Sequence, residues 1–326
     1  MIFVDTGSRD AAFNFGAEYY FAAERDLGAP VFMLWSTTPT LMIGKYQNVF
    51  EEVDLAFARE AGIKITRRLS GGGTIYTDEG GFQYTFIENG GDLIDFSEYM
   101  RPVAEALNKM GVPAVISGRN DMLLDGKKIS GNAQFKLGGK TVHHGSLLFD
   151  TDLCMMERAS RPPEYKITSK SIKSVRDRVT NIKATAGLDM TSERFAEELV
   201  DRIAEITGSM EKYGLTDEDR KRIEKLADEH FRGRDSVFMH SPAFDVEKAC
   251  RFPGGTVKLL FSVKNGIIKD VAAQGDFFSG GGTDALSDLV GTPFEKNSVA
   301  ERIKTSRLAI WGVDNSSLAG EVTKDM

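Results

Sequence analysis

The stretch "DMLLDGKKISGNAQFKLGGKTVHHGSLLF" at residues 121–149 decides the fold class of this chain. Its apolar runs are separated by Asp125-Gly126 and by Gly138-Gly139, and such dipeptides favour the tight turns that join antiparallel strands. We therefore predict three neighbouring antiparallel strands, which indicates a largely antiparallel sheet.

The segments before this stretch add a helix and further strands. Apolar residues at helical spacing predict a helix over about 11–27. The apolar runs 31–35 and 40–44 are separated by a Ser/Thr/Pro turn, and we expect them to pair with each other. The runs 74–77 and 82–87 flank "DEGG" and are expected to form a hairpin. Further helical stripes follow later in the chain, so the elements are those of an α+β protein.

A segment without periodicity, "FRGRDSVFMHSPAF" at 231–244, separates this region from the end of the chain. Beyond it, Asn265-Gly266 predicts a hairpin turn, and helical patterns follow. We expect residues 1–242 to form the main domain and residues 243–326 a small α+β accessory domain. The polar tail at 314–326 is expected to be loose.

Composition limits the classes of function. The chain has 326 residues and a formal net charge of −7, which argues against a general nucleic-acid binder. We read no signal peptide, and no apolar run approaches the roughly 18–20 residues of a membrane span. Cys154 and Cys250 lie far apart in the chain, which fits a reducing compartment. We therefore expect a soluble, cytoplasmic protein that binds neither nucleic acid nor membrane.

The pentapeptide SGGGT occurs twice, at 70–74 and at 279–283. Asp276 and Asp284 flank the second copy, so it suits a turn better than an anion site. Two arginines precede the first copy, and backbone N–H groups beside guanidinium groups suit a phosphate or acyl-phosphate. A structural bulge is the alternative for the first copy.

Three further segments carry polar groups that the hydrophobic pattern does not explain. In "KKISG", strand alternation places Lys128 and Ser130 on one side and Ile129 on the other, so Lys128 can act as a point charge on a phosphate. In "HHGSLLF", His144 and Gly145 are candidate contacts. The block "KITSKSIKSVRDRVTNI" at 166–182 is strongly basic. An exposed strand lysine, a structural histidine and a solvated surface face are the respective alternatives.

Taken in order, these segments resemble the bacterial lipoate–protein ligases. The matching segments are "NFGAEYY", "LWSTTPTLMIGKYQN", "RRLSGGGTIYTD", "GRNDMLLDGKKISGNAQ", "HHGSLLFDTDL" and "KSIKSVRDRVTNI". The resemblance implies a catalytic domain like that of biotin ligases and class II synthetases, with a mixed, largely antiparallel sheet flanked by helices, followed by a small accessory domain.

The resemblance also implies a two-step reaction, in which lipoate and ATP give lipoyl-AMP and the lipoyl group passes to an acceptor lysine. By family position Lys128 is the catalytic lysine, and Asp121 is the expected Mg²⁺ ligand. The implied binding residues are Arg68, Gly73, Thr74, Ile75, Tyr76 and Lys128 for ATP and the adenylate, and Ser70, Gly71, Gly72, Lys128, His144, Gly145 and Ser146 for lipoate. ATP, Mg²⁺ and lipoate arrive as substrates or ion, with no tightly bound cofactor. The implied partners are apo lipoyl domains of 2-oxoacid dehydrogenase E2 subunits or glycine cleavage H protein, and we expect a monomer.

Two departures and two rival functions remain open. Many family members have His at the position of Thr77 and Asn at that of Gly81, which puts acyl preference or rate in doubt. The octanoyltransferases and lipoyl amidotransferases of the same superfamily use a cysteine upstream of the Lys-x-Ser/Thr-Gly segment, and "VISGRNDMLL" has none. A non-catalytic binder of lipoyl-adenylate or of acceptor domains is the other alternative. For Trp35 and Phe86 we favour core packing over ligand contact.

Overall fold

The computed structural model describes residues 1–90, 95–160, 178–233, 236–237, 246–280, 282–324 and 326. The chain divides into two compact units. The first comprises Met1–Ile43, Val49–Arg68 and Thr74–Val237, and the second Gly44–Asn48, Leu69–Gly73 and Phe238–Met326. The boundary expected at residue 242 lies outside the described residues and stays a prediction.

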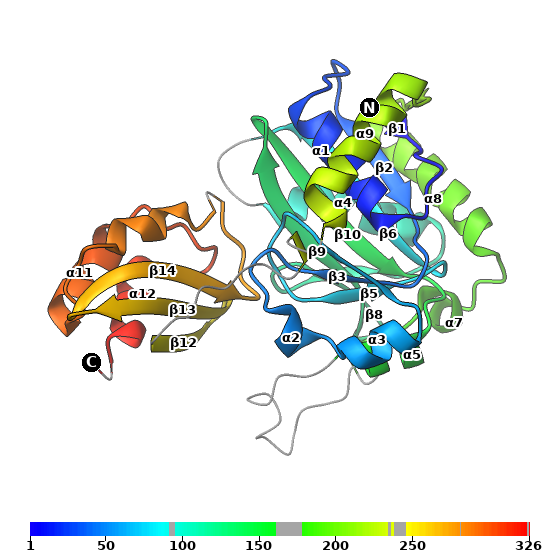
Figure 1. Cartoon of the computed structure of the whole chain (residues 1–326). Helices are drawn as coiled ribbons and strands as arrows, with labels where there is room; N and C mark the ends of the chain where they lie inside the picture. The colour runs from blue at the N-terminus through cyan, green and yellow to red at the C-terminus, as the bar shows by residue number, and fades with distance from the viewer. Residues whose placement is uncertain (91–94, 161–177, 234–235, 238–245, 281, 325) are drawn as a thin grey trace. The chain divides into compact units, whose positions relative to one another are not determined.

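An eight-stranded mixed sheet forms the centre of the first unit (Figure 1). Its strands, in spatial order, are β11 (Glu211–Tyr213), β1 (Ile2–Val4), β2 (Val31–Trp35), β6 (Gly81–Asn89), β10 (Lys140–Leu148), β9 (Lys127–Leu137), β8 (Asp121–Leu124) and β7 (Val115–Ser117). β11, β1 and β2 are parallel, and every other neighbouring pair is antiparallel. The expected largely antiparallel α+β fold is confirmed.

Both hairpin turns predicted within residues 121–149 are confirmed. Asp125 and Gly126 have φ angles of 50° and 72°, and they join β8 to β9. Gly138 and Gly139 have φ angles of 59° and 81°, and they join β9 to β10. Two-residue type I′ turns, whose twist matches that of the flanking strands, require positive φ at both central residues.

A second, three-stranded sheet in the same unit corrects two expectations. It contains β4 (Lys64–Arg67), β3 (Thr40–Ile43) and β5 (Ile75–Thr77). β3 therefore does not pair with β2, and β5 does not form a hairpin with β6. After β5 the chain turns against Asp150 and Thr151 instead, because Gly80 and Gly81 allow an approach that a Cβ atom would block.

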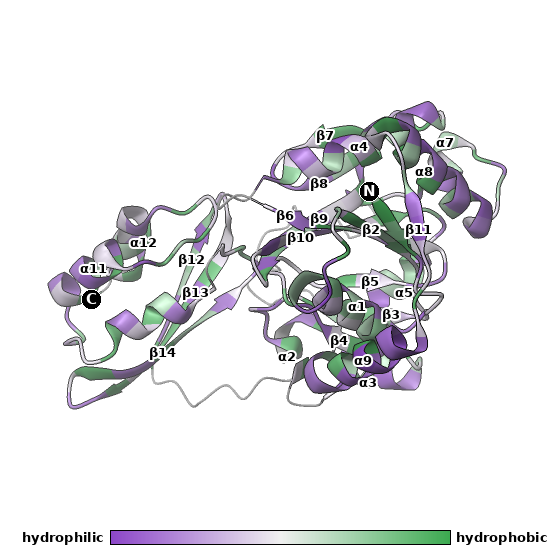
Figure 2. Cartoon of the chain, turned by 90° about the horizontal axis from the view of Figure 1, so that it is seen from above, coloured by the Kyte–Doolittle hydropathy of each residue, from purple (hydrophilic) through white to green (hydrophobic). Residues whose placement is uncertain are grey.

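Helices cover both faces of the large sheet. On one face α1 (Ala11–Ala23) lies beside α9 (Asp217–Ala227) (Figure 1). Phe15 of α1 packs edge-on against Trp35, with 5.5 Å between ring centroids. On the other face lie α4 (Phe96–Lys109) and α8 (Ser192–Thr207), whose Phe195 packs on Phe82. The strand β2 between these layers is apolar along its length, as Figure 2 shows in green. The short helices of this unit are α2 (Val49–Glu52), α3 (Leu55–Glu60), α5 (Leu153–Ala159) and α7 (Ile182–Ala186).

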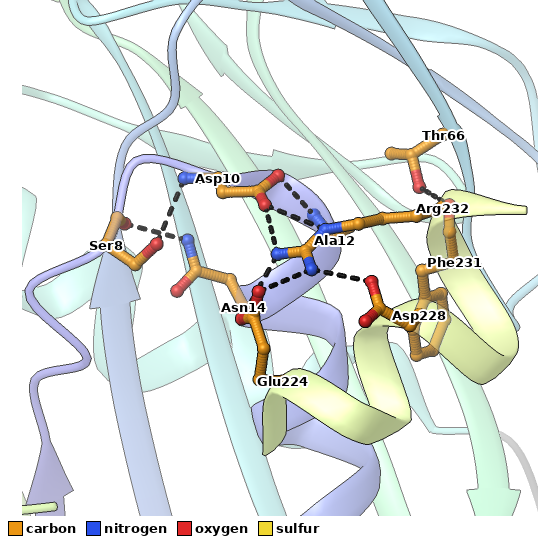
Figure 3. A network of polar contacts seen from close by, with 9 residues as sticks. All are labelled: Ser8, Asp10, Ala12, Asn14, Thr66, Glu224, Asp228, Phe231 and Arg232. Atoms are coloured by element: carbon orange, nitrogen blue, oxygen red, sulfur yellow. Dashed lines mark hydrogen bonds and ion pairs between the residues drawn. The ribbon is translucent and has the colours of Figure 1, made fainter. Parts of the chain in front are cut away.

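Arg232 fixes the start of α1 relative to α9 and to η2 (Asp228–Arg232), the π-helical turn that follows it (Figure 3). Its guanidinium contacts the carboxylates of Asp10 at 2.6 Å, Glu224 at 2.6 Å and Asp228 at 2.8 Å. Asp10 is also the N-cap of α1. These acids, Glu224 first, raise the pKa of Arg232. The network therefore joins two segments that are distant in sequence, the start of α1 and the consecutive elements α9 and η2.

The second unit contains β12 (Val246–Phe252), β13 (Gly255–Lys264) and β14 (Ile267–Gly275), followed by the 3₁₀ helix η3 (Asp284–Leu289), α11 (Lys296–Thr305) and α12 (Asn315–Val322). The hairpin predicted at Asn265-Gly266 is confirmed, with φ angles of 54° and 70°. The expectation of a loose tail is wrong, because Leu318, Ala319 and Val322 of α12 are fully buried in the core of this unit. No described helix is long and apolar enough to cross a membrane.

Candidate active site

Lys128 lies at an irregularity in β9 that changes its expected direction. Leu123 pairs with Lys128 and Met122 with Ser130, so Ile129 is an extra residue, as in a β-bulge. The Lys128 ammonium pairs with Asp121 at 2.7 Å, and both side chains are a little over one-third exposed, at 38% and 37%. The expectation that Lys128 and Ser130 share one side is wrong, because simple alternation fails across the bulge.

Gly131 and Ser146 complete the surroundings of Lys128. A Cβ atom added to Gly131 would lie 3.0 Å from both Cε and Nζ of Lys128. The lysine side chain therefore lies over Gly131, in the space that a side chain at this position would occupy. The Ser146 hydroxyl accepts from Gly131 N at 3.2 Å and donates to Gly131 O at 3.3 Å. Serine thus joins β10 to β9 at the point where their regular ladder has ended. Lys128, Asp121 and Ser146, all predicted site residues, are brought together.

A buried carboxylate that sequence reasoning missed lies on the same face. Glu18 of α1 is 2% exposed, accepts from the Thr85 hydroxyl at 2.7 Å and contacts Nδ1 of His144 at 3.1 Å. Arg68 is 5% exposed and donates to Met42 O at 2.9 Å, and burial lowers its pKa to about 10, an effect that the charge of Glu18 opposes. The signal was a lone carboxylate within the apolar helix "AAFNFGAEYYFAA".

The run Thr74–Tyr76 leads into a polar cluster at the end of β5. Tyr76 is buried, and burial raises the pKa of its hydroxyl, as does the charge of Asp78. Gln83 of β6 donates to the Thr77 hydroxyl at 3.3 Å, and Gln83 is the cross-strand neighbour of Ser146. Thr77 therefore forms a Thr–Gln pair on the strand next to Ser146.

Gly145 is required to be glycine by the packing of neighbouring side chains, without reference to a ligand. Cross-strand pairing places it beside Asn132 and Tyr84, on the face opposite to Ser146, and a Cβ atom would overlap both side chains. The Tyr84 hydroxyl donates to Asn132 Oδ1, and His143 contacts the same oxygen at 3.2 Å. The small size of Gly145 therefore serves this buried network below α4, and its role in lipoate binding stays a prediction.

The first SGGGT copy groups with the second unit up to Gly73. Gly72 has a φ angle of 89° and donates its N–H to Phe277 O at 3.2 Å, while a Cβ atom on Gly71 would overlap the same carbonyl. Ser70 is buried, and its carbonyl accepts from Lys45 N at 2.8 Å. Close approach to Phe277 explains these glycines, whereas lipoate binding by Ser70, Gly71 and Gly72 and nucleotide binding by Gly73 stay predictions.

The remaining predicted features have plainer outcomes. In the second SGGGT copy the Ser279 hydroxyl donates to Gly282 O at 2.7 Å and to Ala309 O at 2.9 Å, which fits a structural loop. Residues 166–177 of the basic block lie outside the described residues. Arg67 donates to the carbonyls of Ser236 and Val237, so at least one of the two arginines before the first copy has a structural use.

A cavity of about 590 Å³ lies away from Lys128. It is lined by the segment after β1, by α8 and by Trp35 and Phe82, and its charged residues are of both signs. Trp35 also donates from Nε1 to the Thr85 hydroxyl at 3.4 Å, while Phe86 packs against Phe32. The expected core packing of these two aromatic residues agrees with these contacts.

Comparison with known proteins matches both parts of the chain. Residues 10–204 match the lipoyl protein ligase A/B catalytic domain, and residues 241–316 match the bacterial lipoate protein ligase C-terminus. The lipoate-protein ligase LplJ of Bacillus subtilis is 35% identical, over 100% of this chain and 98% of the relative. This chain belongs to the lipoate–protein ligase family. Lipoate–protein ligase 1 of Staphylococcus aureus is 34% identical over 90% of each chain.

Solved structures agree on the fold of this lipoate–protein ligase. The crystal structure of Plasmodium falciparum LipL1 in complex with lipoate matches with a TM-score of 0.82 and 20% identity, covering 99% of this chain and 98% of that one. A lipoate-protein ligase A bound with ATP matches with a TM-score of 0.61 and 21% identity, covering 73% of this chain and 97% of that one. At these identities the likeness concerns the fold alone.

Proposed function

We propose that this lipoate–protein ligase activates lipoate with ATP as lipoyl-AMP and transfers the lipoyl group to a lysine of an apo acceptor protein. The observation that carries the proposal is the partly exposed ammonium of Lys128 beside Asp121, Gly131 and Ser146. This arrangement occurs in a chain that is 35% identical to a lipoate–protein ligase over its whole length.

In the first step a lipoate carboxylate oxygen attacks the α-phosphorus of ATP, and the bond to the leaving pyrophosphate breaks. Two anions approach each other, so a fixed cation stabilises the transition state more than the separated reactants. Lys128 is that cation in our assignment, and Arg68 with the Gly73–Tyr76 run would hold the nucleotide. The Lys128 ammonium would then leave Asp121 and contact the reacting oxygens.

Magnesium would enter with the nucleotide phosphates. Among the residues that the structure describes, no group of three His, Cys, Asp or Glu side chains could hold a metal ion. A single carboxylate together with phosphate oxygens and water suits Mg²⁺. We assign Asp121 as that carboxylate, which becomes available when Lys128 turns to the substrates.

In the second step the acceptor amine attacks the acyl carbonyl, the bond to AMP breaks, and the amine loses a proton as the amide forms. We propose lipoyl domains of 2-oxoacid dehydrogenase E2 subunits or glycine cleavage H protein as acceptors. A structure with a similar fold, 23% identical, is that of an archaeal bi-partite lipoate protein ligase and its E2 lipoyl domain. His144 and Ser146 would contact the lipoyl group, and we propose a cytoplasmic monomer.

The test is modification of a purified apo lipoyl domain with lipoate and MgATP, followed by mass spectrometry. Modification should require both ATP and lipoate. A Cys154→Ser, Cys250→Ser variant should work as well as the wild type, because burial raises the pKa of Cys250 and no cysteine precedes the Lys128 segment. Acyl transfer from an octanoylated carrier without ATP, abolished in the double variant, would instead indicate a transferase.

A further inference from the structure

Residues 178–182, the described end of the basic block, lie against β9, the strand that carries Lys128. Val179 forms a parallel bridge with Lys128, and Thr180 N donates to Lys128 O at 3.0 Å. The ladder between β9 and β10 extends only to Asn132, so Val179 and Thr180 take the place of β10 beside Lys128. On its other side Lys128 pairs with Leu123, next to the bulge. The Lys128 backbone is thus held from both sides where regular pairing is interrupted.

Asn181, the next residue, holds this short segment in place. Its Oδ1 accepts from Thr151 N at 3.2 Å, and its Nδ2 donates to Thr151 O at 2.8 Å. One carboxamide therefore satisfies both backbone groups of a residue that is only 3% exposed. A carboxylate offers no donor for the Thr151 carbonyl, and alanine offers neither group.

The segment that Asn181 holds is itself joined to the end of β5. Asp150 N donates to Gly80 O at 2.8 Å, and Asp152 N donates to Asp78 Oδ2 at 2.8 Å. Asp78 lies two positions after Tyr76, the last residue of the Thr74–Tyr76 run, and is buried. Hydrogen bonds and the peptide bonds between neighbouring residues therefore connect the turn after β5, through Thr151 and Asn181, to the Lys128 backbone.

We propose that Asn181 is a positioning residue for Lys128, which fixes the lysine backbone relative to β5 through the Thr180 N–H group. The inference rests on the proposed function, since it concerns the adenylation step of that reaction. Without the Asn181 amide, Thr180 loses its anchor, and the bulged part of β9 can shift. A displacement of about 1 Å in a reacting group can reduce a rate by up to about 10².

The test compares Asn181→Ala with Asn89→Ala, a control at an exposed asparagine at the end of β6. Pyrophosphate release from MgATP and lipoate, with an apo lipoyl domain present to accept the lipoyl group, gives kcat and KM, and a thermal melt gives stability. We expect Asn181→Ala and Asn181→Asp to lower kcat by about 10- to 100-fold, with KM for lipoate within about twofold. The Asn89→Ala control should match the wild type.

A second pair of variants tests the backbone link without touching Asn181. Thr180→Pro removes the N–H group that bonds to Lys128 O, whereas Thr180→Ala keeps it and removes only the hydroxyl, which contacts Thr185 at 2.7 Å. We expect the proline variant to lose kcat and the alanine variant to keep it. In a Lys128→Ala background, Asn181→Ala should cause little further loss, because both changes affect the same group.

Three outcomes would overturn the inference while the wild type remains active. They are a normal kcat for Asn181→Ala, a loss that only follows the melting temperature, and a full additional loss in the Lys128→Ala background. A wild type that releases no pyrophosphate with lipoate and ATP would instead overturn the proposed function, and the inference with it.

Discussion

Lys128 differs from its neighbour Lys127 although both lie in the same strand. Lys127 is exposed, whereas Lys128 is paired with Asp121 and lies along Gly131. A surface ion pair of this kind contributes little to stability. The pair matters for the reaction instead, because it holds the Lys128 ammonium at a defined position.

Replacement of Lys128 by alanine should reduce lipoyl-AMP formation by about 10²–10³, the usual cost of removing one preorganised charge contact. Lys127→Ala is the matched control and should keep most activity, because in our assignment the Lys127 side chain does not contact the substrates. Pyrophosphate release and circular dichroism of both variants provide the measurement. Equal losses with an unchanged fold would sink the assignment.

Gly131→Ala should separate catalysis from stability. The new methyl group would lie 3.0 Å from Cε and Nζ of Lys128, which is too close, but the end of a lysine side chain can move at little cost. We expect roughly a tenfold loss of kcat through the displaced ammonium, with the melting temperature nearly unchanged. A large fall in melting temperature with normal kcat would contradict this picture.

At the scale of residues, resemblance identified more than pattern did. Lys128, Asp121 and Ser146 were named from family position, and they lie together. The alternation argument for Lys128 failed because one extra residue in a bulge leaves no mark in the hydrophobic pattern. Glu18 was missed although it is the lone carboxylate of an apolar helix, because the helical stripe alone does not indicate the polar partners that such a residue contacts.

At the scale of elements, the two adjacent histidines of β10 point to opposite faces of the sheet. His144 meets Glu18 below α1. His143 is fully buried on the side of α4, stacked on Tyr99 with 4.8 Å between ring centroids. Burial lowers the pKa of His143 well below 6.5, so the folded protein keeps this imidazole neutral.

The free energy of unfolding should therefore fall in mild acid. Below about pH 6.5 the unfolded chain binds a proton at His143 that the folded chain does not, so the stability present above that pH is lost as pH falls. The slope from this group approaches about 1.4 kcal/mol per pH unit. His143→Gln should show a shallower dependence in urea unfolding between pH 7.5 and 5.5. Identical slopes would mean that His143 is protonated in the fold.

Turns were more predictable from the sequence than strand partners. Asp125-Gly126, Gly138-Gly139 and Asn265-Gly266 need positive φ, a local requirement that the sequence displays. The partner of β3 or β5 is decided by distant packing, because a strand buried on both faces gives no sign of which sheet it joins. The helix α12 was not expected either, because the polar composition of the tail conceals the three residues that pack into the core, Leu318, Ala319 and Val322.

At the scale of the whole molecule, the chain does not divide at a single point. Segments 44–48 and 69–73 group with the C-terminal residues, and Tyr46 lies in the hydrophobic core of that unit. Its ring stacks on Phe277 with 4.5 Å between centroids and 11° between planes, and its carbonyl accepts from Gly275 N at 2.8 Å. No periodicity in the sequence indicates such a contribution, since it depends on contacts between residues more than 200 positions apart.

This grouping predicts that Tyr46 stabilises the second unit. Tyr46→Ala should lower the free energy of unfolding of that unit by about 3 kcal/mol, the cost of removing a large buried ring. Tyr46→Phe should lower it by about 1 kcal/mol, because only the hydroxyl that is hydrogen-bonded to Ser279 is lost. The chain offers one tryptophan reporter in each unit, Trp35 in the first and Trp311 in the second. In a Trp35→Phe background the unfolding midpoint followed by Trp311 fluorescence should fall, whereas in a Trp311→Phe background the Trp35 signal should change little. If both signals fall equally, Tyr46 supports the main unit as much as the second, and its assignment to the second unit is wrong.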